Sequence, residues 1–493
     1  MGKPNIRSWF LALVVMTLGC LAGDSTDRTN VVLILIDDLG WMDVGAYGST
    51  FYETPNIDRL AASGALFTQF YAASSVCSPT RASIMTGKYP ARLHLTNWIG
   101  GEQKGKMLPA EYIRQLPLEE RTIGEAFKRG GYATAFIGKW HLGGESYYPQ
   151  FQGFDVNIAG HAAGQPGSYF FPYRNERLPW SNVPHLEDGR DGEYLTDRLT
   201  DEALDFIEAN RRRPFFLVLS HYAVHTPLQA KPEASSRYES KAASLSQPGL
   251  PAFIAEGPSA TTKTRQDHAV YAAMVESSDE SVGRILNRLE ELGLASNTAV
   301  VFVSDNGGLS TLSGERTHMP TANLPLRAGK GWLYEGGIRI PLIIHWPGVV
   351  DTAAIIAEPT VSTDIYPTLL AIAGLTPEPQ QHRDGLSLAP LLAQSGPVAR
   401  SAIYWHFPHY HGSGNVPSGA VRAGDYKLIE WLEDGDLELY NLTDDPGETR
   451  DLAEELPAKA VELRNLLHGW RDSLDARLPR QNPNWKDPRG AGQ

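Results

Sequence analysis

Four short runs of aliphatic and aromatic residues constrain the fold of this chain more than any other feature of its sequence. Uninterrupted apolar runs of this length are typical of parallel strands that are buried on both faces of a sheet. Patterns with helical spacing lie between the runs, and this alternation favours an α/β fold with a large, mostly parallel sheet and helices on both faces. The predicted strands are 31–36, 132–137, 215–219 and 299–304, and the predicted helices are 122–129, 196–210 and 268–292.

Polar residues follow each predicted strand immediately. Because ligands of such sheets bind beyond the carboxyl ends of the strands, we expect one site assembled from segments that are far apart in the sequence. The residues concerned are Asp37 and Asp38, Lys139 and His141, His221 and His225, and Asp305 and Asn306.

A Pro- and Gly-rich stretch at 374–397 precedes a different pattern. Short strand-like segments joined by turns, and then one helix, predict a small C-terminal α+β domain with an antiparallel sheet. We therefore divide the chain into a catalytic domain at 28–375 and a small domain at 398–478. Residues 229–267 show little periodicity, which predicts a long surface excursion and a candidate lid. The C-terminal strands are expected at 402–406, 420–423, 426–431 and 437–441, and the helix at 458–474.

Residues 1–23 have the pattern of an export signal. Lys3 and Arg7 precede the apolar segment 9–18, and small residues follow it. The segment is short for a transmembrane helix, although an uncleaved anchor is the alternative. The stretch that ends at Cys20 weakly resembles a lipobox, so we expect an exported protein that is periplasmic, secreted or an outer-surface lipoprotein. No later segment is apolar enough to span a bilayer.

Composition limits both the partners and the redox chemistry. The chain has 44 Lys and Arg against 57 Asp and Glu, and this net charge of −13 argues against nucleic-acid or anionic-membrane binding. Any anion site must therefore be a local basic pocket. Cys20 and Cys77 are the two cysteines. Once Cys20 is removed or lipidated, Cys77 is a single thiol in an oxidising compartment, where an idle thiol is a liability.

Cys77 begins the segment Cys-Ser-Pro-Thr-Arg, which ends at Arg81 and continues to Thr86-Gly87. On this C-x-P-x-R…T-G pattern the chain resembles the formylglycine-dependent (type I) sulfatases, which are arylsulfatase-like. The resemblance extends from Asn30 to about Asp451 and implies an alkaline-phosphatase-like fold. Further blocks of that family occur in the same order at 37–40, 138–143, 329–331 and 335–337.

The resemblance implies that a formylglycine-generating maturation enzyme oxidises Cys77 to formylglycine (3-oxoalanine), whose hydrate carries two hydroxyl groups. One hydroxyl attacks the sulfur of a sulfate ester. Loss of a proton from the second hydroxyl then re-forms the aldehyde and expels sulfate. A serine lacks this route, because its sulfate ester would need water to displace it.

Hard oxygen donors stand at the ends of two predicted strands. An isolated Asp-Asp or Asp-Asn pair is most often a turn or a helix cap, but the shared strand-end position and the resemblance favour a metal site. Carboxylates, an amide and an oxygen from residue 77 suit one Ca²⁺, with Mg²⁺ as second choice, and the lack of a His–Cys cluster disfavours zinc. The expected metal ligands are Asp37, Asp38, Cys77, Asp305 and Asn306.

By the same resemblance, five basic residues complete the catalytic set. Arg81 lies one helical turn after the cysteine and would contact the hydrate and the metal-binding carboxylates. Lys139 and Lys330 would bind sulfate oxygens and stabilise charge in the transition state. His141 would take the proton from the second hydroxyl, and His225 would protonate the leaving alcohol with help from Lys330.

Residues outside this set carry a weaker signal. We expect His221 to be structural. The aromatic and His-rich run 404–411 is typical both of a carbohydrate site and of a core strand. The residues that could line a sugar subsite are Trp98, Glu102, His161, His185, Arg327, His406, His409 and His411.

The predicted activity is hydrolysis of sulfate monoesters with S–O cleavage, by a sulfuric ester hydrolase. The substrate is expected to be a sulfated carbohydrate, from an environmental polysaccharide or a glycosaminoglycan, or an aryl sulfate. One alternative is a phosphomono- or phosphodiesterase of the same superfamily, which would use Ser or Thr with two metal ions and extra His and Asp ligands. The other is a non-catalytic protein that binds sulfated glycans, which would be expected to have lost some of the catalytic positions, whereas none is missing in this sequence.

Overall fold

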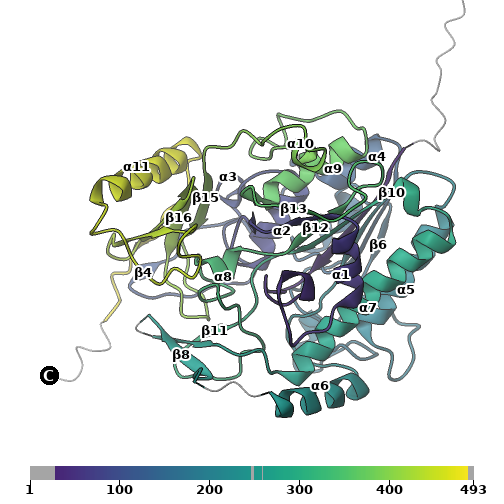
Figure 1. Ribbon diagram of the computed structural model, residues 1–493, viewed down its shortest axis with the longest axis horizontal. Helices are drawn as coiled ribbons and strands as arrows, with labels where there is room; N and C mark the ends of the chain where they lie inside the picture. The colour runs from purple at the N-terminus through teal and green to yellow at the C-terminus, as the bar shows by residue number, and fades with distance from the viewer. Residues whose placement is uncertain (1–27, 246–248, 258, 487–493) are drawn as a thin grey trace, which may run out of the picture.

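The computed structural model describes residues 28–245, 249–257 and 259–486. The predicted signal at 1–23, with Cys20, lies outside the described residues. Within those ranges, no helix is both long enough and apolar enough to cross a membrane. Figure 1 shows a large sheet between two layers of helices, with a smaller sheet and helix α11 (Pro457–Ser473) at one end.

The four strands predicted from the sequence lie side by side in an eight-stranded sheet. β1 (Asn30–Ile36) pairs in parallel with β10 (Thr298–Ser304) and with β7 (Phe215–Ser220), and β5 (Ala133–Gly138) pairs in parallel with β7. Their carboxyl ends therefore lie along one edge of the sheet. β12 (Leu342–His345) is the exception, because it runs antiparallel to β10. The predicted mostly parallel sheet is therefore confirmed. The sheet is completed by β6 (Val156–Ile158), β2 (Ala65–Phe67) and β13 (Ala354–Ile356).

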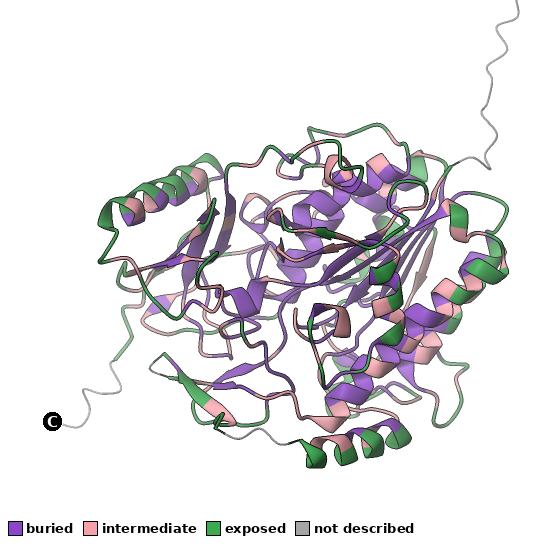
Figure 2. Cartoon of the chain, in the orientation of Figure 1, coloured by how far each residue is buried: buried purple, intermediate pink, exposed green. Residues whose placement is uncertain are grey.

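Both faces of the central strand are covered. From Val31 to Ile36, the even-numbered residues of β1 belong to one apolar core and the odd-numbered residues to another. This two-sided burial explains why the β1 sequence is apolar at nearly every position rather than at alternate ones. Figure 2 shows the strands in the middle of the large sheet coloured as buried. The first core includes side chains of α1 (Pro55–Ala62), α5 (Leu195–Ala209) and α7 (Ala269–Glu291), and the second includes side chains of α2 (Cys77–Thr86), α4 (Ile123–Arg129) and α9 (Ile365–Ile372).

The excursion at 229–267 is more regular than its sequence suggested. It contains α6 (Pro232–Ser244), which buries Ala234 and Tyr238 alone, so its apolar face is too narrow to produce a helical pattern. A hairpin of β8 (Phe253–Glu256) and β9 (Ala260–Lys263) follows, and β9 pairs with β11 (Thr311–Ser313). The other short elements are β3 (Phe70–Tyr71), α3 (Pro90–Leu93), β4 (Met107–Leu108), α8 (Glu335–Ile338), β14 (Thr360–Val361), α10 (Ala389–Leu392) and β19 (Arg480–Gln481).

The C-terminal unit is the predicted antiparallel sheet with one helix. Its outer face packs against α11, and its inner face shares an apolar core with the region around α8. Because that core joins both units, the boundary between 375 and 398 stays a prediction. The strands, in order across the sheet, are β15 (Ile403–Phe407), β16 (Ser418–Ala423), β17 (Tyr426–Trp431) and β18 (Leu437–Asn441).

A buried ion network fastens the two units together. Nζ of Lys427, on β17, lies 3.0 Å from a carboxylate oxygen of Glu335 on α8 and 2.8 Å from one of Glu448, and all three side chains are 0% exposed. Glu448 also accepts a hydrogen bond from the backbone N–H of Glu335 at 2.6 Å. One ammonium group thus serves two carboxylates in the absence of solvent.

Replacing Lys427 with methionine is expected to lower the free energy of unfolding by about 3–5 kcal/mol, because Glu448 would stay buried without the ammonium at 2.8 Å, and Glu335 would keep the more distant guanidinium of Arg339, at 3.6 Å. Chemical denaturation followed by tryptophan fluorescence measures the change. The matched control is Lys459→Met on α11, where the pair with Glu462 is solvent-exposed and contributes about 1 kcal/mol or less. Equal losses from the two variants would contradict this account of the network.

Candidate active site

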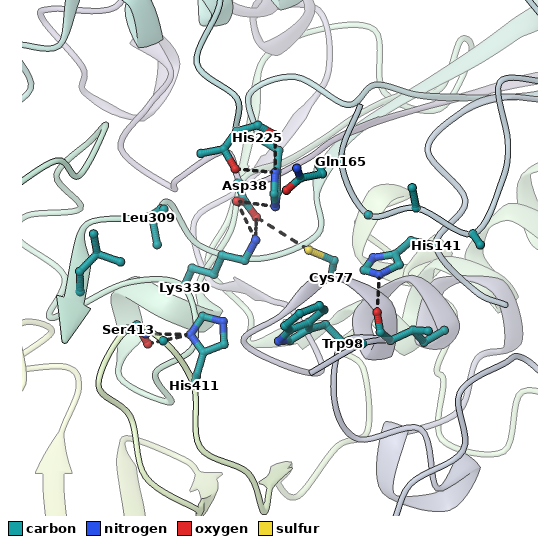
Figure 3. Close-up of a pocket in the computed structure, with 18 of the residues that line it drawn as sticks. Asp38, Cys77, Trp98, His141, Gln165, His225, Leu309, Lys330, His411 and Ser413 are labelled. Carbon is teal, nitrogen blue, oxygen red and sulfur yellow. Dashed lines mark hydrogen bonds and ion pairs between the residues drawn. The ribbon is translucent and has the colours of Figure 1, made fainter. Parts of the chain in front are cut away.

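The carboxyl ends of the central strands and the first turn of α2 bring the predicted site residues together. Figure 3 shows Asp38, Cys77 and Lys330 around one cavity, with His225 and His141 on its walls. The positions in the chain explain this, because Asp37 and Asp38 follow β1, Lys139 follows β5, His225 follows β7, Asp305 and Asn306 follow β10, and Cys77 and Arg81 belong to α2.

Cys77 lines the cavity and is buried, with 2% of its surface exposed. Its Sγ lies 3.9 Å from Oδ1 of Asp38. Burial raises the pKa of the Cys77 thiol to about 12, and the ammonium groups of Lys139 and Lys330 offset part of that effect. The unmodified thiol is therefore protonated at neutral pH and is a poor nucleophile.

Four oxygen-bearing side chains form a cluster beside Cys77. Nδ2 of Asn306 donates to Oδ1 of Asp38 at 2.8 Å, and the backbone N–H of Asp38 donates to Oδ1 of Asp305 at 3.1 Å. Ligand atoms of Asp37, Cys77 and Asp305 lie within 4.8 Å of one another. Among the described residues, Oδ1 of Asp37 and Oδ1 of Asn306 are buried and have no hydrogen-bond partner. Buried oxygens without a donor fit a hard cation such as Ca²⁺ or Mg²⁺.

Three cations lie against the carboxylates of the cluster. The guanidinium of Arg81 is fixed by two further hydrogen bonds, since its Nη1 donates to the backbone oxygen of Lys139 and to Oγ of Ser220, each at 2.8 Å. Arg81 and Lys139 are fully enclosed, whereas Lys330 lines the cavity. The pairs are Arg81 Nε with Asp305 Oδ2 at 2.8 Å, Lys139 Nζ with Asp37 Oδ2 at 2.6 Å, and Lys330 Nζ with Asp38 Oδ2 at 2.7 Å.

The two adjacent aspartates have opposite pKa shifts. Burial raises the pKa of Asp37 well above its usual value, although the charge of Lys139 opposes the shift. Burial also disfavours ionisation of Asp38, but Lys330 and His225 outweigh it and hold the pKa of Asp38 below its usual value. A divalent cation beside Asp37 would favour its ionised form.

His225 lies beside Asp38, with Nε2 3.7 Å from Oδ2. Its Nδ1 is 2.9 Å from the backbone oxygen of Thr226, which assigns the proton of the neutral ring to Nδ1. Burial lowers the pKa of His225 to about 3, and the charge of Lys330 acts in the same direction. An anionic ester in the cavity would raise this pKa, because a nearby negative charge stabilises the imidazolium.

His141 is arranged to accept a proton. Its Nε2 lies 3.2 Å from the backbone oxygen of Ile99, whereas its buried Nδ1 has no partner within the described part of the chain. Burial lowers the pKa of His141 well below its usual value, so the ring is neutral. Gly164 packs directly on the imidazole, since a Cβ there would stand 2.4 Å from Cε1. Any side chain at this position would displace the ring.

The cavity has a volume of about 590 Å³, within the range of small-molecule sites. Two of the residues predicted to contact sugar, Trp98 and His411, line it. His221 instead lies 2.8 Å from Oγ of Ser281, in agreement with a structural role. The other six lie away from the lining: Glu102 pairs with Arg114, His161 contacts Tyr222, Arg327 pairs with Glu256, His406 contacts the backbone oxygen of Arg477, His409 contacts Thr96, and His185 is exposed.

Several lining residues had no signal in the sequence. Most come from connections between elements, and Trp180 and Leu312 come from a 3-10 helix and a strand of three residues each, where neither periodicity nor a motif singles out one side chain. These residues are Ile99, Gly100, Ala162, Ala163, Gly164, Gln165, Trp180, Thr226, Leu309, Leu312, Arg316, Gly412 and Ser413.

Comparison with known proteins agrees with this geometry. A family profile described as sulfatase matches residues 29–375, which is most of the chain. The chain belongs to the sulfatase family. A second profile, described as the C-terminal region of N-sulphoglucosamine sulphohydrolase, matches residues 328–471 of this sulfatase. The two matches overlap at 328–375, so Lys330 falls within both.

Curated relatives of the sulfatase carry the same activity in their names. A sulfatase from Formosa agariphila is 32% identical, covering 91% of this chain and 89% of the relative. N-acetylgalactosamine-6-sulfatase of Mus musculus is 33% identical, covering 94% of this chain and 84% of the relative. Human steryl-sulfatase is 30% identical, covering 78% of this chain and 73% of the relative.

Solved structures share the fold. The crystal structure of Ps i-CgsB in complex with k-i-k-neocarrahexaose is 28% identical with a TM-score of 0.70, covering 94% of this chain and 96% of that one. The predicted alkaline-phosphatase-like fold and sulfatase membership are thus confirmed, and this sulfuric ester hydrolase hydrolyses sulfate esters. The roles of individual site residues stay predictions.

Proposed function

We propose that this sulfatase is exported and removes sulfate from carbohydrate monoesters by S–O cleavage, with formylglycine at position 77 and Ca²⁺ as its metal. The observation that carries the proposal is that Cys77 belongs to two groups of potential metal-ligating side chains. Its Sγ belongs to one compact group with Asp37 and Asp305 and to another with Asp38 and His225. Residue 77 therefore lies where metal-binding, anion-binding and proton-transfer groups meet.

The oxygen cluster fits the metal. The side chains of Asp37, Asp38, Asp305 and Asn306 would hold the ion together with an oxygen on residue 77. Two of these side chains have buried oxygens that accept no hydrogen bond from the described residues, and the set contains no nitrogen or thiolate donor that favours zinc. When bound, Ca²⁺ supplies Lewis-acid chemistry toward oxygen atoms in its reach.

The environment of Cys77 supports its conversion to formylglycine by a maturation enzyme. The thiol is protonated and enclosed, so it is unsuited to direct attack on a sulfate ester. The hydrated aldehyde supplies an oxygen nucleophile and a second hydroxyl for release of sulfate. Residue 77 lies at the start of α2, so the chemistry takes place on a rigid element rather than on a loop.

The surrounding side chains divide the remaining tasks. Lys330 lines the cavity and would bind a sulfate oxygen, while Lys139 and Arg81 hold the carboxylates from behind. His141 would accept a proton at its unpartnered Nδ1. His225 would bring a proton to the leaving oxygen at Nε2, having gained it with the anionic substrate.

Replacing His225 with alanine is expected to slow hydrolysis of a sugar sulfate by roughly 10²–10⁴-fold and that of nitrophenyl sulfate much less, because an alkoxide needs a proton as it leaves and nitrophenolate does not. Steady-state kinetics on both esters measures the difference. The matched control is His221→Ala, a nearby histidine outside the cavity. Equal losses on the two esters would contradict the general-acid role.

The carbohydrate preference rests on the relatives. Ps i-CgsB was crystallised with k-i-k-neocarrahexaose, and several curated relatives are N-acetylgalactosamine-6-sulfatases. Export, to the periplasm, the medium or the outer surface as a lipoprotein, rests on the pattern of residues 1–23. Fractionation of the producing cells, with mass determination of the mature N-terminus, tests export and lipidation of Cys20.

Side-by-side assays test the reaction against its alternatives. We expect release of sulfate from aryl and sugar sulfates, with much weaker release of phosphate from the matching aryl phosphate. In the described residues, both candidate metal groups lie at the same place, whereas a two-metal phosphatase needs a second set of ligands. Efficient phosphate release, or binding of sulfated glycans without turnover, would refute the proposal.

A further inference from the structure

The cavity extends beyond the groups that the reaction uses. The chemistry occupies the side formed by Asp38, Cys77 and Lys330, while Trp98 and His411 face the cavity on the side away from Asp38 (Figure 3). The remaining lining includes two large side chains without an assigned task, Trp180 and Arg316. Both are exposed, and both come from connections rather than from the central sheet.

Trp180 presents its indole to the solvent while its backbone is fixed. The residue is 59% exposed, although it lines the cavity. Its neighbour Ser181 is buried and donates its hydroxyl to the backbone oxygen of Leu178 at 2.7 Å, and Val183 is 5% exposed. An exposed aromatic ring on an anchored turn is a rigid platform for the apolar face of a sugar ring.

Arg316 is a cation without a counter-ion. No hydrogen bond or ion pair of its side chain is found among the described residues, and Asp38 is the one carboxylate among the described residues that line the cavity. Glu315 precedes it in the chain but does not line the cavity. In a protein with a net charge of −13, an unpaired arginine at a pocket is a local anion site.

The strand that precedes Arg316 is held on two sides. The backbone N–H of Ser313 donates to the oxygen of Gly412 at 3.2 Å, and that of Gly314 donates to the oxygen of Ser259 at 2.7 Å. β11 also pairs with β9, so the excursion at 229–267 supports this wall of the cavity. The turn that carries Arg316 thus begins from a fixed position.

We propose that Trp180 and Arg316 form an outer subsite for a second sugar ring that carries an anionic group, with the ring on the indole and its carboxylate or sulfate on the guanidinium. This inference rests on the proposed activity toward carbohydrates. A wholly apolar occupant such as a sterol would use the aromatic walls but would leave Arg316 unpaired.

The test compares kcat/KM of the wild type and Arg316→Ala on nitrophenyl sulfate and on four matched saccharides: a monosulfated monosaccharide, and disaccharides whose second ring is neutral, carries a uronic carboxylate or carries a second sulfate. Loss of a charge-assisted hydrogen bond is expected to reduce kcat/KM by roughly 10–100-fold on one or both anionic disaccharides. The other substrates should change less than about 3-fold. The anionic disaccharide whose kcat/KM falls in Arg316→Ala shows whether the bound anion is a carboxylate or a sulfate.

Two further variants complete the test. Trp180→Ala is expected to raise KM by roughly 3–10-fold on all three disaccharides and not on the monosaccharide. Arg212→Ala, an exposed arginine before β7 at the opposite edge of the sheet, should change nothing. If the wild type cleaves the saccharides and Arg316→Ala has no selective effect on the anionic disaccharides, the subsite proposal is overturned and the carbohydrate proposal is not. Wild type that cleaves steryl or aryl sulfates but none of the saccharides overturns the carbohydrate proposal as well.

Discussion

Replacing Cys77 with alanine is expected to reduce turnover of nitrophenyl sulfate by at least about 10⁴-fold while the protein stays folded. Residue 77 supplies the nucleophile, and losses of this size follow removal of a nucleophile that acts with its neighbours as a unit. The side chain is small and makes no hydrogen bond shorter than 3.9 Å among the described residues, so the fold does not depend on it. Thermal unfolding of the variant should match the wild type.

A separate experiment tests whether Cys77 is oxidised to formylglycine in the active enzyme. Intact-peptide mass spectrometry and an aldehyde-reactive probe should detect formylglycine, and turnover should rise in proportion to its fraction. Cys77→Ser, produced without a serine-oxidising system, is expected to release at most one equivalent of product. Full activity from protein whose Cys77 is wholly thiol would overturn the mechanism.

Replacing Asp305 with alanine is expected to abolish turnover and weaken metal binding together, since this carboxylate is an expected ligand. It should also lower the free energy of unfolding by about 3–5 kcal/mol, because the guanidinium of Arg81, 2% exposed, would lose its carboxylate partner at 2.8 Å and keep the more distant carboxylate of Asp37, at 3.6 Å. Metal analysis of the purified protein and chemical denaturation measure the two effects.

The control for this variant is Asp201→Ala. Asp201 pairs with Arg284 at the surface, where it is 54% exposed, so its loss should cost about 1 kcal/mol or less and leave metal content unchanged. Stoichiometric zinc with no calcium in the wild type would refute the metal assignment. Retention of both metal and activity by Asp305→Ala would remove this residue from the site.

The core of the fold and of the site was predictable because it depends on local rules. Strands buried on both faces must be apolar throughout, so β1 and its neighbours are recognisable one by one, and parallel pairing then places their carboxyl ends together. The sequence motif that begins at Cys77 then indicated which reaction the site carries out. The antiparallel position of β12 was not predictable, because a short apolar strand carries no sign of its direction.

The outer wall of the cavity was beyond sequence reasoning for a different reason. Trp180 and Arg316 are 136 residues apart in the chain, and that both line one cavity depends on turns and on the pairing of β11 with β9. Histidine-rich sequence was a poor guide as well. His406 and His409 are buried against Arg477 and Thr96, whereas His411, two residues beyond His409, reaches the cavity.

Because of the ion network around Lys427, the two units depend on each other for folding. Glu335 lies on the segment that also carries Lys330, and its partner comes from the C-terminal sheet, so this cavity lysine depends on a strand almost a hundred residues later. A shortened chain that ends near residue 375 would keep nearly every recognised motif yet lack Lys427, so that Arg339, 3.6 Å from Glu335, would be the nearer of the remaining cations. Chimaeras between sulfatases should therefore be joined before residue 328, or should take the residues at positions 335 and 427 from the same parent.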